Sequence, residues 1–319
     1  MTGAPIRIGI SSCLLGQKVR FDGGHKRDDF LTGTFSTYVE FVPVCPEIEA
    51  GFGPPREPMR LVRGGEGGAV RLITVKTGID LTSRLAVFSR GRAKQLEKED
   101  LCGYVLKKDS PSCGMERVKV YDHNMVPSKT GQGLFAEALI ARFPFLPVEE
   151  EGRLVDPQIR DNFVERVFAY RRLRDLFESR WTSGSLVAFH TAHKLTLMAH
   201  SIAAYQQLGR LVASAKETPR DQLRARYTEG FMTALAGIAT PKRHTNVLQH
   251  MAGYFKKLLD PPSRAELASA IEDYRRGLVP LIVPITLLRH HVRHHGMTYL
   301  AGQVYLDPHP KELMLRNHV

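Results

Sequence analysis

Hydrophobic residues in the first half of the chain fall in short runs separated by polar loops. The runs at Ile6–Ile10, Tyr38–Val44, Val70–Val75 and Gly103–Lys108 contain many β-branched and aromatic residues and predict strands. Between the last two runs, an amphipathic pattern over Ser83–Gln95 predicts a helix. Strands that alternate with helices favour an α/β fold with a mainly parallel sheet.

Beyond residue 150 the apolar positions recur with helical spacing almost throughout, which predicts an all-α region. The expected helices are Ile159–Arg180, Leu186–Leu208, Pro219–Gly237, Thr245–Leu259, Arg264–Gly277 and a further apolar helix that reaches His291. Pro144 and Pro147 end a short helix, and the polar stretch Glu149–Gly152 follows as a joint. We therefore predict an α/β domain over residues 1–150 and an all-α helical domain over residues 151–319.

Charge and hydropathy limit the classes of partner. No run of about 18 apolar residues occurs, so the sequence predicts no membrane span. The first residues lack a basic stretch followed by a long apolar run, so a cytoplasmic location is expected. The net charge of +12 divides into +3 over residues 1–150 and +9 over the remainder. A basic helical half suits RNA, which leaves RNA binding as an alternative function, although a solvated basic surface has the same composition.

The cysteines carry the most specific chemical signal. Cys13, Cys45 and Cys113 each lie in a loop that contains Pro or Gly and follows a predicted strand. Because the carboxyl ends of parallel strands meet at one edge of a sheet, we expect these thiols to converge. Three thiolates suit a [4Fe–4S] cluster with one iron left open, whereas isolated buried cysteines act as small apolar residues. No pair has the CxxC spacing of a zinc site.

Cys102 differs from these three because it lies at the start of a predicted strand. We expect it to be a buried structural thiol. As a fourth ligand it would close the cluster, and the function would then be electron transfer or redox sensing.

Glu47 is the first candidate catalytic group. It lies two residues after Cys45, so it must be close to any cluster that Cys45 holds. We expect a carboxylate partly desolvated beside Val44 and Ile48 to suit the role of a base for water. The alternative is an acid that stabilises the first turn of a helix beginning at Pro46.

Hydroxyl and carboxyl groups in the neighbouring loops are further candidates. Ser110 and Ser112 flank Pro111, where they are either functional hydroxyls or ordinary turn formers. Asp22 precedes two glycines that allow close approach of a ligand to the backbone, so it is either a substrate contact or a turn former.

Four segments that contain these residues resemble the motifs of the thiouracil desulfidase family. They are Ser11–Gly16, Val19–Gly24, Cys45–Glu47 and Lys108–Gly114, and the resemblance spans about residues 5–145. It implies a [4Fe–4S] cluster on three cysteines, whose open iron binds the sulfur of a thiolated pyrimidine such as 2-thiouracil. It also implies non-redox replacement of that sulfur by oxygen from water, with help from an acid and a serine.

Carried over by motif, the resemblance assigns roles to residues of this chain. The implied cluster ligands are Cys13, Cys45 and Cys113, and the implied catalytic pair is Glu47 with Ser110. From their loop positions, Ser112 and Asp22 are further candidate substrate contacts. Ser112 is the second choice for the catalytic serine. The expected enzyme is a thiouracil desulfidase, which converts C=S to C=O and releases sulfide.

The second half, from about residue 180, resembles a YbgA-type helical domain of unknown function. The matching segments are Phe189–Lys194, Met198–Ser201, Asn246–His250 and Tyr299–Leu306. The resemblance implies no activity for this half.

Histidines and arginines of the second half offer weaker signals. His190, His193 and His200 share one face of the predicted helix, and we expect them to be buried and hydrogen-bonded, since no acid lies in the adjacent turn to complete a metal site. The basic segment Arg289–His295 suits either contact with phosphates or the end of a solvated helix.

Overall fold

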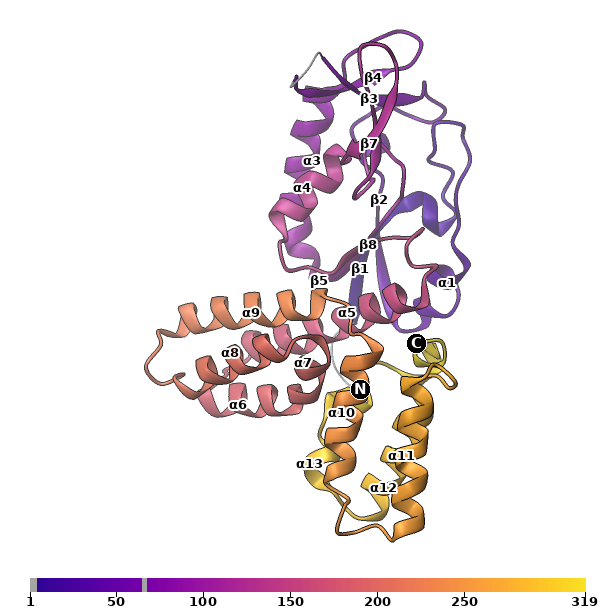
Figure 1. Ribbon diagram of the computed structural model, residues 1–319. Helices are drawn as coiled ribbons and strands as arrows, with labels where there is room; N and C mark the ends of the chain where they lie inside the picture. The colour runs from indigo at the N-terminus through magenta and orange to yellow at the C-terminus, as the bar shows by residue number, and fades with distance from the viewer. Residues whose placement is uncertain (1–4, 65–67) are drawn as a thin grey trace. The chain divides into compact units, whose positions relative to one another are not determined.

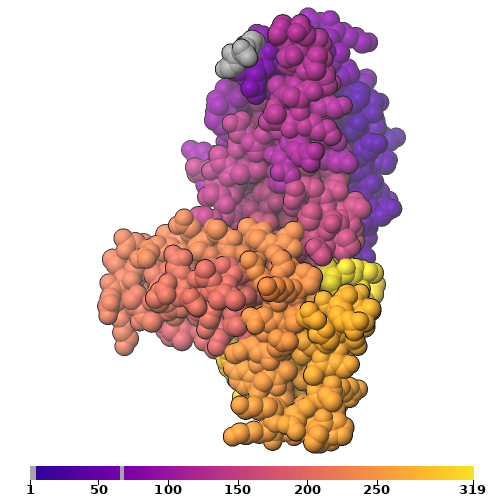
Figure 2. Space-filling view, in the orientation of Figure 1, coloured from indigo at the N-terminus to yellow at the C-terminus, as the bar shows by residue number. Residues whose placement is uncertain are grey.

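The structure is a computed structural model that describes residues 5–64 and 68–319. The chain divides into one unit that ends at Val155 and a second unit over Asp156–Val319. Figures 1 and 2 show the first unit in indigo to magenta and the second in pink through orange to yellow. Each unit has its own core and is described by itself.

A parallel sheet forms the centre of the first unit. Its strands are β1 (Ile6–Ser11), β2 (Val39–Val44), β5 (Leu101–Leu106) and β8 (Val148–Glu150), in the order β2-β1-β5-β8. Each neighbouring pair is parallel. All six residues of β5 are buried, as expected for a central strand with both faces covered. The predicted α/β fold with a mainly parallel sheet is therefore confirmed.

Two longer helices follow strands of this unit, as the alternation predicts. They are α3 (Thr82–Leu96) and α4 (Leu134–Arg142), which pack against each other. Shorter helical turns connect the strands at other places: η1 (Ser12–Leu15), α1 (Asp29–Thr32), η2 (Phe35–Thr37), α2 (Pro46–Glu49) and η3 (Glu97–Glu99).

A second sheet in the first unit is mostly antiparallel, and the sequence does not predict it. Its strands are β3 (Met59–Arg63), β4 (Val70–Thr74), β6 (Val118–Tyr121) and β7 (Pro127–Gly131), in the order β4-β3-β6-β7. Only β4 was expected as a strand. The other three are short, and β7 is almost entirely exposed, so its pairing with β6 and not its hydrophobicity makes it a strand.

The predicted polar joint at Glu149–Gly152 is wrong, because its first two residues belong to strand β8. Glu149 and Glu150 are each only 5% exposed. Their carboxylates are paired: Glu150 Oε1 accepts from the backbone N–H of Met115 at 2.6 Å, and Glu149 Oε1 lies 2.7 Å from Arg153 Nε. Because both carboxylates have hydrogen-bond or ion-pair partners, the two acids can be buried in a strand that the polar sequence does not predict.

The second unit consists of helices. They are α5 (Pro157–Glu178), α6 (Ser183–Ala192), α7 (Lys194–His200), α8 (Ile202–Ala213), α9 (Arg220–Ala236), α10 (Pro241–Gly253), α11 (Pro261–Arg275), α12 (Ile282–His294), α13 (Thr298–Ala301), η4 (Val304–Leu306), η5 (Lys311–Leu313) and η6 (Leu315–Asn317). Asp156 caps α5 by accepting from the N–H groups of Gln158 and Ile159, and Pro157 suits the first turn. The predicted all-α region is confirmed. Among the residues that the structure describes, no helix is both long and apolar enough to cross a membrane.

One predicted helix, Leu186–Leu208, is broken into α6, α7 and α8. The side chain of Gln303 separates the first two: its Oε1 accepts from Leu195 N at 3.3 Å, and its Nε2 donates to Thr191 O at 2.9 Å. Ser201 begins α8 by accepting from Ala204 N at 3.2 Å. His190, His193 and His200 therefore do not share one continuous helix face, although all three are buried and hydrogen-bonded.

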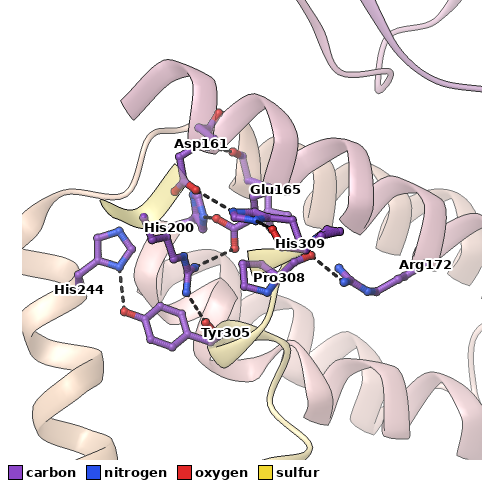
Figure 3. A network of polar contacts seen from close by, with 12 residues as sticks. Asp161, Glu165, Arg172, His200, His244, Tyr305, Pro308 and His309 are labelled. Atoms are coloured by element: carbon purple, nitrogen blue, oxygen red, sulfur yellow. Dashed lines mark hydrogen bonds and ion pairs between the residues drawn. The ribbon is translucent and has the colours of Figure 1, made fainter. Parts of the chain in front are cut away.

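A buried polar network ties the last residues of the chain to α5 (Figure 3). His309 Nε2 lies 2.8 Å from Asp161 Oδ1, and His200 Nε2 lies 3.4 Å from Glu165 Oε2. Arg316 Nη2 is 3.8 Å from Glu165 Oε1, and His244 Nδ1 is 2.9 Å from the Tyr305 hydroxyl. Arg172 donates to the carbonyl of Pro308 at 2.7 Å. Charges removed from water need such partners, so the network fixes where the chain's last segment packs.

Two buried histidines in this unit predict a loss of stability in weak acid. Burial and the Arg316 guanidinium lower the pKa of His244 to about 3, and burial lowers the pKa of His193 to about 4. In the unfolded chain both take up protons near pH 6.5, so the unfolded state binds more protons and the folded state loses stability as pH falls below that value. Between pH 7 and pH 5 we expect each histidine to lower the free energy of unfolding by about 2 kcal/mol.

Urea unfolding followed by fluorescence of Trp181, the one tryptophan of the chain, measures this effect. His200 does not cancel this loss. Burial lowers the pKa of His200, but the hydrogen bond that it donates to the Glu165 carboxylate raises the pKa by more, and the stabilising contribution of His200 stays constant below pH 6.5. The His244→Gln variant should lose about half of the difference between pH 7 and pH 5. Equal stability of the natural chain at the two pH values would contradict the prediction.

Candidate functional site

The three predicted cysteines meet at one edge of the parallel sheet. Cys13 lies in η1 directly after β1, Cys45 directly follows β2, and Cys113 lies in the loop after β5. Since β1 is paired in parallel with both β2 and β5, the carboxyl ends of these strands lie together. All three cysteines line one pocket of about 340 Å³.

The loop that carries Cys113 is a tight turn that its own residues enforce. The hydroxyl of Ser110 accepts from the backbone N–H groups of Ser112 at 3.2 Å and Cys113 at 3.1 Å. A Cβ on Gly114 would lie 2.8 Å from the carbonyl oxygen of Ser110 and 2.3 Å from Val118, so only glycine fits there. The turn therefore holds the Cys113 thiol at a defined place in the pocket.

Burial keeps the three thiols protonated when no metal is present. It raises the pKa of Cys13 to about 11, although the nearby Lys107 ammonium opposes the shift. Burial likewise raises the pKa of Cys45, and it raises that of Cys113 well above its usual range. Cys45 raises the pKa of Cys13, and both of these residues raise the pKa of Cys113, in keeping with their shared pocket. A metal would displace these protons, because it binds cysteine as the thiolate.

The pocket offers three thiols as soft metal ligands. Within residues 5–64 and 68–319, no three His, Cys, Asp or Glu side chains are placed to hold one metal ion. A [4Fe–4S] cluster binds each thiolate through a different iron. Cys102 does not line the pocket; it is buried at the beginning of β5, with its Sγ 3.9 Å from the carbonyl oxygen of Asp100.

Glu47 lines the same pocket and is held from two sides. Its Oε1 accepts from the hydroxyl of Ser112 at 2.8 Å, and its Oε2 forms an ion pair with Arg56. Arg56 also donates to the carbonyl oxygens of Val19 at 2.9 Å and Gly53 at 3.0 Å. These contacts fix the carboxylate in one orientation, a requirement for a group that moves a proton at a defined atom.

Arg56 is a pocket residue that the sequence did not indicate. It lies in the irregular, Gly- and Pro-containing segment 51–58, where the pattern predicts only a loop. Its pairing with Glu47 depends on the fold. The one sequence feature that could have indicated Arg56 is that it is the single basic residue of this loop.

The two candidate serines have different surroundings. Ser112 is fully buried and does not line the pocket, and its hydroxyl donates a hydrogen bond to Glu47. Ser110 lines the pocket and accepts two backbone N–H groups, so its hydroxyl proton is left to donate into the pocket. The structure therefore separates a serine that faces the pocket from one that contacts the acid.

Asp22 does not reach the pocket. Its side chain is 49% exposed, accepts from Gly24 N at 2.9 Å and lies 3.5 Å from Arg20. That backbone N–H and the Arg20 guanidinium lower the pKa of Asp22. Its neighbours Arg20 and Phe21 line the pocket instead, together with Lys26, Lys107 and Lys108.

The fold and this pocket define a two-domain protein whose α/β unit gathers three thiols and a carboxylate at the edge of a parallel sheet. The chain belongs to the 2-thiouracil desulfurase family, whose family model matches residues 8–151. A second family model, described as a protein of unknown function (DUF1722), matches residues 194–310. The predicted fusion of a thiouracil desulfidase domain with a YbgA-type helical domain is confirmed, and the prediction of a desulfidase is confirmed at the level of the family.

Three individual proteins each resemble slightly less than half of the chain. The uncharacterized protein YbgA of Escherichia coli (strain K12) is 35% identical over 158 residues, which cover 49% of this chain and 94% of YbgA. The uncharacterized protein YbbK of Bacillus subtilis (strain 168) is 32% identical over 139 residues, covering 41% of this chain and 87% of YbbK. A solved structure, the [4Fe–4S]-dependent thiouracil desulfidase TudS, is 28% identical, covers 47% of this chain and 93% of its own, and has a TM-score of 0.38.

The alternative of RNA binding gains no support from the basic segment at the end of α12. Arg289 Nη1 lies 2.9 Å from Asp307 Oδ1, so its charge is already paired. His291 is buried. His290, Arg293 and His294 are exposed, which fits the solvated helix end that the sequence also allowed.

Proposed function

We propose that the first unit removes sulfur from a thiolated pyrimidine nucleobase of the 2-thiouracil type and replaces it with oxygen from water. The observation that carries the proposal is the pocket in which Cys13, Cys45 and Cys113 lie together with Glu47. Its volume of about 340 Å³ suits a single nucleobase. Val44, Pro58 and Met59 contribute apolar surface for a planar ring.

Cys13, Cys45 and Cys113 would hold a [4Fe–4S] cluster as its three protein ligands. When bound, such a cluster supplies one iron without a protein ligand, a Lewis acid for the soft sulfur of a thiocarbonyl group. The donor set fits the group, since soft thiolates are its usual ligands and Cys102 lies outside the pocket. The pocket therefore offers no fourth cysteine that would bind the remaining iron.

The side chains around the pocket supply the proton transfers. Glu47 accepts a proton from water as the water oxygen forms its bond to the ring carbon, and it returns the proton to sulfur as the C–S bond breaks. The two protons of water leave with sulfur as hydrogen sulfide, so atoms balance and no electrons are transferred. Ser110 lines the pocket, and its hydroxyl donates a hydrogen bond to a polar atom of the ring.

Anaerobic reconstitution with iron and sulfide, followed by 2-thiouracil turnover, tests the proposal. We expect a brown protein with about four iron atoms per chain that forms uracil and sulfide in equal amounts. A colourless protein that binds no iron would overturn the cluster. A brown protein inactive on 2-thiouracil and on thiolated uridine would overturn the substrate class while retaining the cluster.

A further inference from the structure

A group of ring side chains in the helical unit surrounds one lysine. Lys194 is the first residue of α7, and five residues from other elements gather near it. They are His190 of α6, Tyr205 of α8, His250 of α10, Tyr254 directly after α10, and Tyr299 of α13. We name these six side chains the Lys194 cluster. They belong to no pocket of the desulfidase unit.

Direct contacts join the members of the Lys194 cluster. The Lys194 ammonium lies 5.7 Å from the centre of the Tyr205 ring, and the His190 ring stacks on Tyr205 with centres 6.1 Å apart. Tyr254 stacks on Tyr299 with ring centres 5.6 Å apart. His250 packs edge-on against Tyr254 at 5.6 Å.

Helix α7, which begins with Lys194, packs against α6, α8 and α10, and this packing brings Lys194 near residues of all three helices. Burial lowers the pKa of His190 and of His250, and in both cases the Lys194 ammonium lowers it further. The same ammonium acts on Tyr254. One cation therefore influences residues of α6 and α10 that are far apart in sequence.

The position of Lys194 is built into the fold. The break between α6 and α7, which puts Lys194 at a helix start, is held by the two hydrogen bonds of the buried Gln303 to Thr191 and Leu195. His193 closes α6 through a 2.8 Å contact between its Nδ1 and the carbonyl of Phe189. A lysine on a freely moving surface loop would need no such support.

The Lys194 cluster contains a cation and no acid. Lys194 is half-buried, and across the described part of the chain no carboxylate lies within ion-pair distance of its ammonium. The cluster still reaches solvent, because Tyr254 is 37% exposed and His250 is exposed. A partly desolvated cation favours an anion from outside, and tyrosine rings favour a flat ring stacked on them.

We propose that the Lys194 cluster binds a phosphorylated aromatic small molecule, of which a nucleoside monophosphate is the common kind. Lys194 and the exposed His250 contact the phosphate, and the tyrosine rings stack against the base. The helical unit then has a ligand site of its own, independent of the proposed desulfuration.

Protection of Lys194 from acetylation tests this site in the full-length chain without interference from the desulfidase pocket. The rate of acetylation of each lysine by a water-soluble acylating reagent is followed by peptide mass spectrometry, with exposed Lys216 of the same unit as the internal control. We expect 5′-UMP to slow the acetylation of Lys194 and not of Lys216, and uridine or inorganic phosphate alone to require about tenfold higher concentration. An unchanged Lys194 rate in the presence of 5′-UMP would overturn the proposal.

A variant separates ring stacking from simple attraction of phosphate. Tyr254→Leu keeps an apolar side chain at a partly exposed position and removes the ring. The 5′-UMP concentration that halves the acetylation rate of Lys194 should rise about tenfold in this variant, since stacking on one aromatic ring is lost. The same concentration in both chains would show that the tyrosines do not contact the ligand and would reject the proposed ligand class.

Discussion

Replacement of Cys113 by serine is expected to leave the protein colourless after anaerobic reconstitution and inactive on 2-thiouracil. Cys113 is one of only three thiols that line the described pocket, so its loss leaves two protein ligands. A hydroxyl is a poor substitute for a soft thiolate on iron. Cys13→Ser and Cys45→Ser should have the same effect. The measurements are visible absorbance, iron per chain, and release of uracil and sulfide.

Cys102→Ser is the matched control for this series. Cys102 is buried in the same unit but lies outside the pocket, so its variant should keep both the cluster and turnover. Any loss should be limited to stability, because a hydroxyl replaces a buried apolar group. Loss of the cluster in Cys102→Ser would instead favour a closed cluster with four cysteines and a redox or sensing role. Full turnover in Cys113→Ser would remove the cluster from the mechanism.

The convergence of the cysteines could be predicted from the sequence because it depends on topology alone. Cys13 and Cys45 directly follow strands, and Cys113 lies in the loop after a third strand. A parallel arrangement of those strands is sufficient to bring the residues to one edge. No side-chain detail enters the argument, which is why residues 32 and 68 positions apart could be grouped before the structure was known.

The contacts of Glu47 could not be predicted, because they join loops that have no regular pattern. Ser112 is 65 residues from Glu47 in sequence, and Arg56 lies in a segment that forms neither helix nor strand. Hydrophobic periodicity gives no information about such segments. The choice between Ser110 and Ser112 also stayed open for this reason, since both flank the same proline and only their hydrogen bonds distinguish them.

In the helical unit the sequence predicted the secondary structure better than the side-chain arrangement. The apolar period is continuous from Leu186 to Leu208, and it continues through the break at His193. That break depends on Gln303, about a hundred residues later, and local propensity cannot report it. The polar network on α5 has the same origin, because Asp161 and Glu165 find their histidine partners only in the folded chain.

Replacing Glu47 with glutamine should lower turnover of 2-thiouracil by about 10²–10⁴-fold while leaving the cluster in place, because the variant removes a proton acceptor and no cluster ligand. Glutamine keeps the size of the side chain and can still accept from Ser112, so the pocket should retain its shape. We expect the iron content and visible spectrum to match the natural chain. The KM should change much less than kcat, since the loss falls on the chemical step.

Two further variants make the interpretation specific. Ser112→Ala removes one hydrogen bond to the Glu47 carboxylate, so it should lower kcat by about tenfold and leave the iron content unchanged. Glu137→Gln replaces an exposed acid of α4 outside the pocket and should have no effect on turnover. If Glu47→Gln turned over 2-thiouracil as fast as Glu137→Gln, Glu47 would be only a helix-terminal acid, and proton transfer would have to be assigned to another group lining the pocket. A Glu47→Gln protein that lost its iron would instead make Glu47 part of cluster assembly, because the carboxylate is held by the same loops that carry Cys45 and Cys113.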